Sequence, residues 1–296
     1  MKFVQLMRPK HWTKNVFLFA ALTFGQKLTE PAAVGRAVGG FICFCLAASA
    51  VYIFNDIIDR EADRLHPEKR NRPIAAGSVP VASAAVASAL CAAAALIASL
   101  VLGWSFALVV LAYIVLVILY TLVLKKVMIL DCVVISTGFC LRAIAGATVV
   151  GVFISPWLVV CTFALCLFLA FTKRRAELTQ LREDSEPFRK ALAGYTPELL
   201  AHMVNVTSGL AVVCFLLYAM DERTLRLFGT SDLVYTTPLV LYCVFRFSAS
   251  MQKGRFSDPV QLILTDWPFQ IGLVLWVVAC VGIVYSGRLG IHLSSI

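Results

Sequence analysis

The amino-acid sequence predicts an all-α, polytopic membrane protein, a bundle of about nine transmembrane helices whose N-terminus lies in the cytoplasm. Two observations lead to this prediction. The 296-residue chain is 60% hydrophobic and only 15% charged, a composition outside the range of soluble domains. Its apolar residues are also gathered into long runs that contain no Asp, Glu, Lys or Arg. At about 1.5 Å per helical residue, a run of ~20 residues crosses a hydrocarbon core of ~30 Å.

Five charge-free runs are the clearest spans: Ala37–Phe54, Val79–Leu102, Ser105–Leu124, Pro156–Thr172 and Phe269–Gly287. Three further runs hold isolated polar residues: Met128–Gly151 with Asp131 and Arg142, Leu199–Met220 with His202 and Asn205, and Leu233–Met251 with Arg246. The short run Val16–Gln26 completes the nine and is the weakest candidate. We expect a single transmembrane domain over residues 1–296, with cytoplasmic loops at about 55–78, 125–131 and 173–198.

The distribution of charge orients the helices. In this topology the inner segments hold 19 of the 26 Lys and Arg residues and the outer segments hold 5. Because cytoplasmic loops carry the excess of positive charge, the charged loops face the cytoplasm from the plasma (inner) membrane. The net charge of +9 is then explained by contact with membrane lipids, and no soluble domain remains to bind nucleic acid. The ten cysteines include no C-x-x-C pair and are expected to pack as apolar residues.

The stretch "NDIIDREAD", residues 55–63, follows the second span and gathers acidic residues at the membrane edge. Asn55, Asp59 and Asp63 are spaced at i, i+4 and i+8, so they share one face of a helix, and Asp56 lies one residue round. Carboxylates this close repel one another unless a cation lies among them. Carboxylate and amide oxygens suit magnesium, which usually bridges substrate phosphates. The hypothesis is a Mg²⁺ site made by these four residues; a solvated helix end paired with neighbouring arginines is the alternative.

Other polar residues lie at the same predicted face. Apart from Arg8, Lys10 and Asp131, these residues and Arg142 are expected to bind substrate, the cations through its phosphate groups. Before the first span, "RPKHWTKN" supplies Arg8, Lys10, Lys14 and Asn15; the loop after the second supplies Lys69, Arg70 and Arg72; the turn after the fourth supplies Tyr120, Lys125, Lys126 and Asp131; and the segment after the sixth supplies Lys173, Arg174 and Arg175. Arg142 lies within the fifth span, and an intramembrane arginine is by default a functional candidate. A structural pair remains the alternative for Arg142, and a structural role is favoured for Arg246, His202 and Asp266.

These motifs resemble the UbiA superfamily of intramembrane prenyltransferases, and the resemblance covers essentially the whole chain. It rests on the nine expected spans, on "NDIIDREAD" after the second, on the Tyr-then-Lys element after the fourth and on a polar segment after the sixth. The resemblance implies a magnesium-dependent transferase with two acidic motifs that hold the metal on an isoprenyl diphosphate. It also implies that Asp56, Asp59 and Asp63 are catalytic.

The sequence departs from the family pattern after the sixth span. The segment "TKRRAEL" stands where a second aspartate-rich motif is expected, and the nearby Glu177, Glu183 and Asp184 do not reproduce the spacing of the first. Cations cannot ligate magnesium but can bind a phosphate directly. One acidic site and one cationic site suggest two phosphorylated ligands, whereas prenyl transfer to an aromatic acceptor would need one.

The motifs "RPKHWTKN", "NDIIDREADRLHPEKRNRPIAAG", "GFCLRAIAGA" and "TKRRAEL" resemble the branch of the superfamily that transfers phosphoribose. This resemblance implies a pentosyltransferase with phosphoribosyl pyrophosphate as donor and a polyprenyl (decaprenyl-type) phosphate as acceptor. The product would be a lipid-linked arabinose precursor for the cell envelope. Two alternatives stay open: a prenyltransferase with an aromatic acceptor, and a transporter with Asp131 and Arg142 in an ion pathway. Homo-oligomers are also left open, since small-residue helix faces permit association without specifying it.

Overall fold

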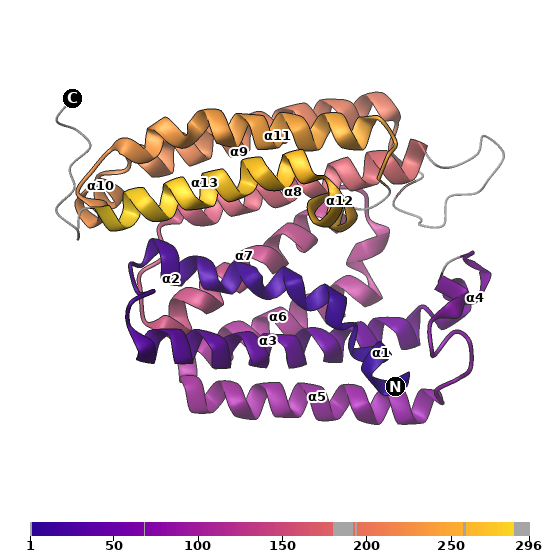
Figure 1. Ribbon diagram of the computed structural model, residues 1–296. Coiled ribbons are helices and arrows are strands. Elements are labelled where there is room, and N and C mark those ends of the chain that lie inside the picture. The colour runs from indigo at the N-terminus through magenta and orange to yellow at the C-terminus, as the bar shows by residue number, and fades with distance from the viewer. Residues whose placement is uncertain (1, 68, 180–191, 193, 257–258, 287–296) are drawn as a thin grey trace. The chain divides into compact units, whose positions relative to one another are not determined.

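The computed structural model describes residues 2–67, 69–179, 192, 194–256 and 259–286, and every regular element among them is a helix (Figure 1). The described helices fall into two compact units, one formed by the chain up to Phe153 and one formed by the chain from Ile154 onward. The expected single domain therefore stays a prediction, and each unit is described by itself.

The first unit contains seven α-helices and three short 3-10 helices. In chain order these are α1 (Lys2–Met7), η1 (Pro9–Phe19), α2 (Ala20–Phe24), α3 (Pro31–Ile58), α4 (Arg60–Leu65), η2 (Lys69–Asn71), α5 (Val81–Leu102), α6 (Trp104–Leu122), η3 (Leu124–Lys126) and α7 (Leu130–Val150). The described part of the second unit contains α8 (Pro156–Thr179), α9 (Pro197–Met220), α10 (Glu222–Phe228), η5 (Asp232–Thr236), α11 (Thr237–Gln252), α12 (Pro259–Thr265) and α13 (Trp267–Ser286).

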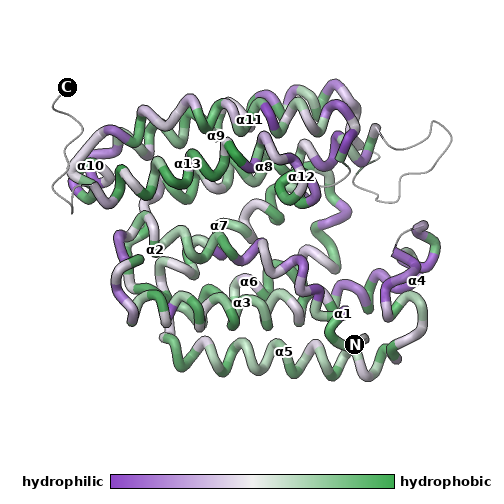
Figure 2. Tube along the Cα trace, viewed as in Figure 1, coloured by the Kyte–Doolittle hydropathy of each residue, from purple (hydrophilic) through white to green (hydrophobic). Residues whose placement is uncertain are grey.

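Eight helical segments of the described chain are long and apolar enough to cross a membrane, and they coincide with eight of the nine expected spans. The expected count of nine is not confirmed. The remaining span, Val16–Gln26, overlaps the end of the 3-10 helix η1 and the short helix α2. Figure 2 shows apolar residues along the long helices of the first unit and a hydrophilic α4 beyond the end of α3.

Helix α3 is the centre of the first unit. In its most apolar window 61% of the residues are buried, against 11% in α5, which packs on its outer side. Helices α6 and α7 and the 3-10 helix η1 also pack on α3. The approach of η1 to α7 depends on Gly146, because a Cβ atom at that position would lie 2.0 Å from the carbonyl oxygen of Leu18. The close contact fixes η1, and with it the residues that precede the first apolar segment.

In the second unit, α8 packs along α9, and α11 packs along α13. The ring of Phe247 lies 5.5 Å from that of Phe168 and 5.9 Å from that of Phe269, so aromatic contacts join α8, α11 and α13. Beside these rings Arg246 pairs with Asp266, which lies between α12 and α13. The structural role favoured for these two residues is consistent with this contact.

Candidate functional site

The acidic stretch lies where α3 passes into α4. The backbone N–H of Asp59 donates to the carbonyl of Asn55 at 2.9 Å, and that of Asp63 donates to the carbonyl of Asp59 at 2.8 Å. The helical hydrogen-bond pattern therefore continues through Asp59, although α3 ends at Ile58 and the ψ angle of Asp59 is 4°. The small break at Asp59 separates the side chains of the motif into two groups.

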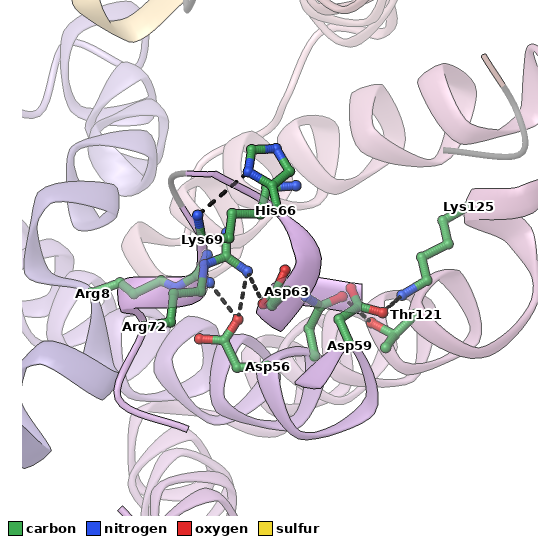
Figure 3. Close-up of polar contacts among 10 residues, drawn as sticks. Arg8, Asp56, Asp59, Asp63, His66, Lys69, Arg72, Thr121 and Lys125 are labelled. Atoms are coloured by element: carbon green, nitrogen blue, oxygen red, sulfur yellow. Dashed lines mark hydrogen bonds and ion pairs between the residues drawn. The ribbon is translucent and has the colours of Figure 1, made fainter. Parts of the chain in front are cut away.

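Asp56 and Asp63 form the first group and share one guanidinium. Nη1 of Arg72 donates to Asp56 Oδ1 at 3.0 Å and to Asp63 Oδ2 at 2.6 Å, while Nη2 of Arg8 donates to the same Oδ1 of Asp56 (Figure 3). The two aspartates are 3% and 4% exposed. Two buried carboxylates are thus neutralised by two arginines, one from η1's N-terminal edge and one from the loop after η2.

Asn55 and Asp59 form the second group and face the end of α6. The Thr121 hydroxyl donates to Asn55 Oδ1 at 3.3 Å, and Lys125 pairs with Asp59. Figure 3 shows Asp59 directed toward Lys125, whereas Asp56 and Asp63 lie around Arg72. The expected grouping of three residues on one face, with Asp56 beside them, is therefore replaced by two pairs.

Within the described residues, no three acidic, histidine or cysteine side chains gather around one point that could hold a metal ion. The reason is local, because the carboxylates of the motif are directed toward different cations. The donors themselves fit magnesium: they are hard oxygen ligands, and two of them already converge on a single positive group, Nη1 of Arg72.

Of the three cations expected to bind phosphate in the loop after α4, only Arg72 reaches the aspartates. The loop is fixed to α4 by Arg64, whose Nε donates to the Ala75 carbonyl at 3.1 Å. Arg70 is exposed and Lys69 is half-buried, with its backbone N–H 3.4 Å from Nδ1 of His66. Lys69 and Arg70 stay candidates for contact with a bound anion.

The turn between α6 and α7 contains a strained backbone. Ile129 has a φ of 68° and a ψ of −48°, and the N–H of Leu130 donates to the Met128 carbonyl at 2.8 Å, which makes a γ-turn rare for a β-branched residue. Asp131 follows in the first turn of α7 and is fully buried. Lys125 reaches Asp59, whereas Lys126 is exposed and Tyr120 is half-buried.

Arg142 is buried among neutral acceptors. It is 4% exposed and donates to Asn15 Oδ1, the Gly138 carbonyl and the Tyr113 hydroxyl, each at 2.8 Å. Its guanidinium also lies 4.7 Å from the centre of the Tyr113 ring. Arg142 and Asn15 thus join η1 to α6 and α7, and Lys14, the residue before Asn15, is half-buried. This geometry favours a positioning role for Arg142 over direct contact with a phosphate.

The three cations of the second unit do not share one face. Lys173, Arg174 and Arg175 are consecutive residues of α8, and consecutive side chains of a helix point in directions about 100° apart. Arg174 is 2% exposed and pairs with Glu177 at 2.5 Å, while Lys173 and Arg175 are half-buried. Glu183 and Asp184, together with most of the expected loop after Thr179, lie outside the described residues.

Two residues that contact the acidic motif, Arg8 and Thr121, could not be identified as its partners from the sequence. Arg8 was one of several cations before the first apolar segment, and its contact with Asp56 joins residues 48 positions apart. Thr121 gave no signal beyond its place next to Tyr120. Spacing arguments find neighbours within one helix, and both contacts cross between elements.

Comparison with known proteins shows which family the chain belongs to. The sequence profile of the UbiA prenyltransferase family matches residues 16–262. The chain belongs to this family. A decaprenyl-phosphate phosphoribosyltransferase of Mycolicibacterium smegmatis is 32% identical over 93% of this chain and 89% of its own length. The protein of that name from Corynebacterium glutamicum is 32% identical over 95% of this chain and 86% of its own length.

The fold expected from the family resemblance is confirmed by structural similarity. A UbiA homologue from Archaeoglobus fulgidus, solved with GPP and Mg²⁺ bound, superimposes with a TM-score of 0.72 over 96% of this chain and 99% of its own. The two sequences are 20% identical, so this likeness concerns the fold. As a family member with eight long apolar helices among its described residues, the chain is an integral membrane protein.

Proposed function

We propose that this UbiA family member transfers 5-phosphoribose from phosphoribosyl pyrophosphate to a polyprenyl phosphate of the decaprenyl type. In this reaction the bond between the anomeric carbon and the diphosphate breaks, and a bond from that carbon to an oxygen of the lipid phosphate forms. Diphosphate leaves with the electron pair, and the product is a lipid-linked precursor of arabinose.

The observation that carries the proposal is the pairing of acids with cations at the α3–α4 junction, in a chain whose relatives along most of their length are named decaprenyl-phosphate phosphoribosyltransferases. The acids suit a metal, and the cations suit phosphate groups. A reaction between two phosphorylated substrates needs both.

Asn55, Asp56, Asp59 and Asp63 are the residues that would hold magnesium. When bound, this metal would neutralise negative charge on the departing diphosphate. Donor phosphates would contact Arg72 together with Lys69, Arg70 and Lys14. The turn between α6 and α7 would contribute Tyr120, Lys125 and Lys126. On α8, Lys173 and Arg175 are the better candidates for a second phosphate, since Arg174 is buried against Glu177.

The reaction needs positioning more than proton transfer. The lipid phosphate is already an anion at neutral pH, so it can attack the anomeric carbon without a general base. The difficulty is to hold two anionic substrates at reacting distance, which cationic side chains achieve by neutralising them. In-line displacement would invert the anomeric centre. The excess of Lys and Arg in the α3–α5 and α6–α7 loops favours a site that opens to the cytoplasm from the plasma membrane.

The test uses purified protein in detergent, phosphoribosyl pyrophosphate labelled in the ribose, Mg²⁺ and decaprenyl phosphate. Label is expected in the organic phase, and it should be lost with EDTA and return when Mg²⁺ is added in excess. Because the carboxylates keep their cationic partners without metal, EDTA should leave the unfolding temperature unchanged. Absence of labelled lipid, together with turnover of a prenyl diphosphate and an aromatic acceptor, would refute the donor assignment and support an ordinary prenyltransferase.

A further inference from the structure

Arg8 is held in an unusual conformation beside the acidic motif. Its φ of 52° and ψ of 60° lie in the left-handed region, which is rare for a residue other than glycine and is found here directly before Pro9. Its guanidinium pairs with Asp56 and lies 5.6 Å from the centre of the Tyr52 ring. Strained backbone of this kind persists where the surroundings fix it, and it is concentrated at ligand sites.

The four residues Arg8, Arg72, Asp56 and Asp63 form a closed set with no net charge. The aspartate side chains are the inner members, 3% and 6% exposed, and the arginine side chains are the outer members, 17% and 26% exposed. An anion that approaches from solvent therefore meets the arginines first. A cation has to reach carboxylates whose charge is already compensated.

The arginines also keep unused hydrogen-bond donors. Among the described residues, Arg8 donates through Nη2 alone and Arg72 through Nη1 alone. A guanidinium offers further N–H groups in a planar fork that fits phosphate oxygens. Each arginine can thus bind an anion with one side of its fork while the other side still faces a carboxylate.

We infer that Arg8, together with Arg72, binds the diphosphate of the donor, and that its pairing with Asp56 makes the binding of metal and of diphosphate mutually dependent. This inference rests on the proposed function, because it concerns the same site. Metal alone would leave two partly buried arginines without a counter-charge. Diphosphate alone would leave two buried carboxylates beside added negative charge, which is unfavourable. With both ligands present every charge keeps a partner, so each ligand raises the affinity for the other.

Without metal, removal of the Asp56 carboxylate should strengthen the binding of pyrophosphate. In Asp56→Asn, Arg8 loses its only carboxylate partner among the described residues and is free to bind an anion. Pyrophosphate should therefore bind Asp56→Asn more tightly than the wild type when EDTA is present, by about ten-fold, within the usual range of coupling between sites. If the aspartate served only as a metal ligand, its removal would leave metal-free binding of pyrophosphate unchanged.

The experiment is isothermal titration of the full-length protein in detergent with pyrophosphate, once in EDTA and once in excess Mg²⁺. Arg8→Gln should weaken binding of pyrophosphate in Mg²⁺ by about ten-fold, a loss that a merely structural arginine would not produce in the folded protein. Glu61→Gln is the matched control, since Glu61 is an exposed carboxylate of α4 that pairs with Arg60 and Arg64. Its affinity for pyrophosphate should stay at the wild-type value under both conditions.

A second variant covers the case in which Asp56→Asn is unstable. If Asp56→Asn does not fold, Asp63→Asn replaces it. Arg72 then keeps only Asp56 as a partner, and the two arginines outnumber the remaining carboxylate, so a smaller gain in the same direction is expected in EDTA. Unchanged binding in EDTA for the folded variant would overturn the inference, even where labelled lipid forms in the transfer assay. Conversely, tighter binding of pyrophosphate by the variant in EDTA, together with no transfer of phosphoribose by the wild type, would uphold the inference about Arg8 and refute the proposed donor.

Discussion

Two buried aspartate–arginine arrangements, one in each unit, differ in what else their carboxylates contact. Asp56 and Asp63 of the first unit receive side-chain hydrogen bonds from arginines alone, within the part of the chain that the structure describes. Asp266 of the second unit accepts from Arg246 at 3.1 Å and also from the Ser250 hydroxyl at 2.8 Å and the backbone N–H of Phe269 at 3.2 Å. Its exposure of 6% is close to that of the other two. Burial therefore does not distinguish the two arrangements, whereas neutral donors do.

The difference indicates which carboxylate can change partners. Asp266 precedes α13 and caps its N-terminus through the N–H of Phe269, so its position is part of the helix. A new partner for Asp266 would have to replace a backbone contact. Asp56 and Asp63 are held by the ends of long side chains, which can turn to another ligand without unfolding a helix. The first arrangement is suited to binding and the second to stability.

The largest expected effect is on phosphoribosyl transfer, and it concerns the arrangement of the first unit. Asp63→Asn should lower phosphoribosyl transfer by about 10²–10³-fold, the usual loss when a group that stabilises transition-state charge is removed. Its free energy of unfolding should change by less than that of Asp266→Ala below, because Arg72 keeps Asp56 as a partner and no buried charge is left without a counter-charge. Transfer assays and thermal unfolding in detergent measure the two quantities. Equal activity of Asp63→Asn and the control Glu61→Gln would remove the functional half of the comparison.

The reverse pattern is expected for Asp266→Ala. This change removes the cap of α13 and the partner of Arg246 together, so it should lower the free energy of unfolding by about 3 kcal/mol. The folded fraction should transfer phosphoribose at the wild-type rate. The measurement is thermal unfolding in detergent, with the rate normalised to protein that elutes as a single species. A stable variant without activity would contradict the structural role.

The sequence predicted most of the fold because the spans are read from composition alone. Eight apolar runs became helices with nearly the expected bounds, as in Val79–Leu102, which became α5 from Val81. The short run at Val16 was the exception, because it begins within a 3-10 helix fixed by a close contact at Gly146. Such a contact between backbones leaves no periodic pattern in a sequence.

The position of the acidic motif at the end of a long apolar helix could be predicted, but the partners of its side chains could not. The spacing of Asn55, Asp59 and Asp63 places all three where α3 passes into α4. It could not show that Asp59 turns toward Lys125 while Asp63 turns toward Arg72, because these contacts join different elements. Arg142 illustrates the same limit: its neutral acceptors are invisible in a sequence.

A milder substitution tests how much the Ser250 hydroxyl contributes to holding Asp266. Ser250→Ala removes one neutral donor and leaves the arginine and the cap in place, so it should lower the free energy of unfolding by about 1 kcal/mol. Thermal unfolding in detergent detects this. The control is Ser248→Ala, a half-buried position on the same helix whose hydroxyl accepts a hydrogen bond from Gln252. A loss as large as that of Asp266→Ala would mean that the hydroxyl, and not the cap, holds the carboxylate.

The smallest expected effect concerns pH. Burial raises the pKa of Asp266. Hydrogen bonds from Ser250, Phe269 and Arg246 lower the pKa by more than burial raises it, so the pKa lies below its ordinary value. A carboxyl group whose pKa is lowered by folding stabilises the folded state above its unfolded pKa, about 3.9, and loses that contribution as pH falls through the folded pKa. Asp266→Asn retains a side chain that can cap α13, so it isolates the contribution of the charge.

The difference in unfolding temperature between the wild type and Asp266→Asn should therefore be constant from pH 7 to about pH 4 and should shrink below it. Thermal unfolding in detergent at a series of pH values gives this difference directly. Since asparagine keeps the cap, the plateau should lie below the loss measured for Asp266→Ala. If the difference stayed constant to pH 3, the charge of Asp266 would not be what Arg246 and Ser250 stabilise, and the second arrangement would owe its stability to the cap alone.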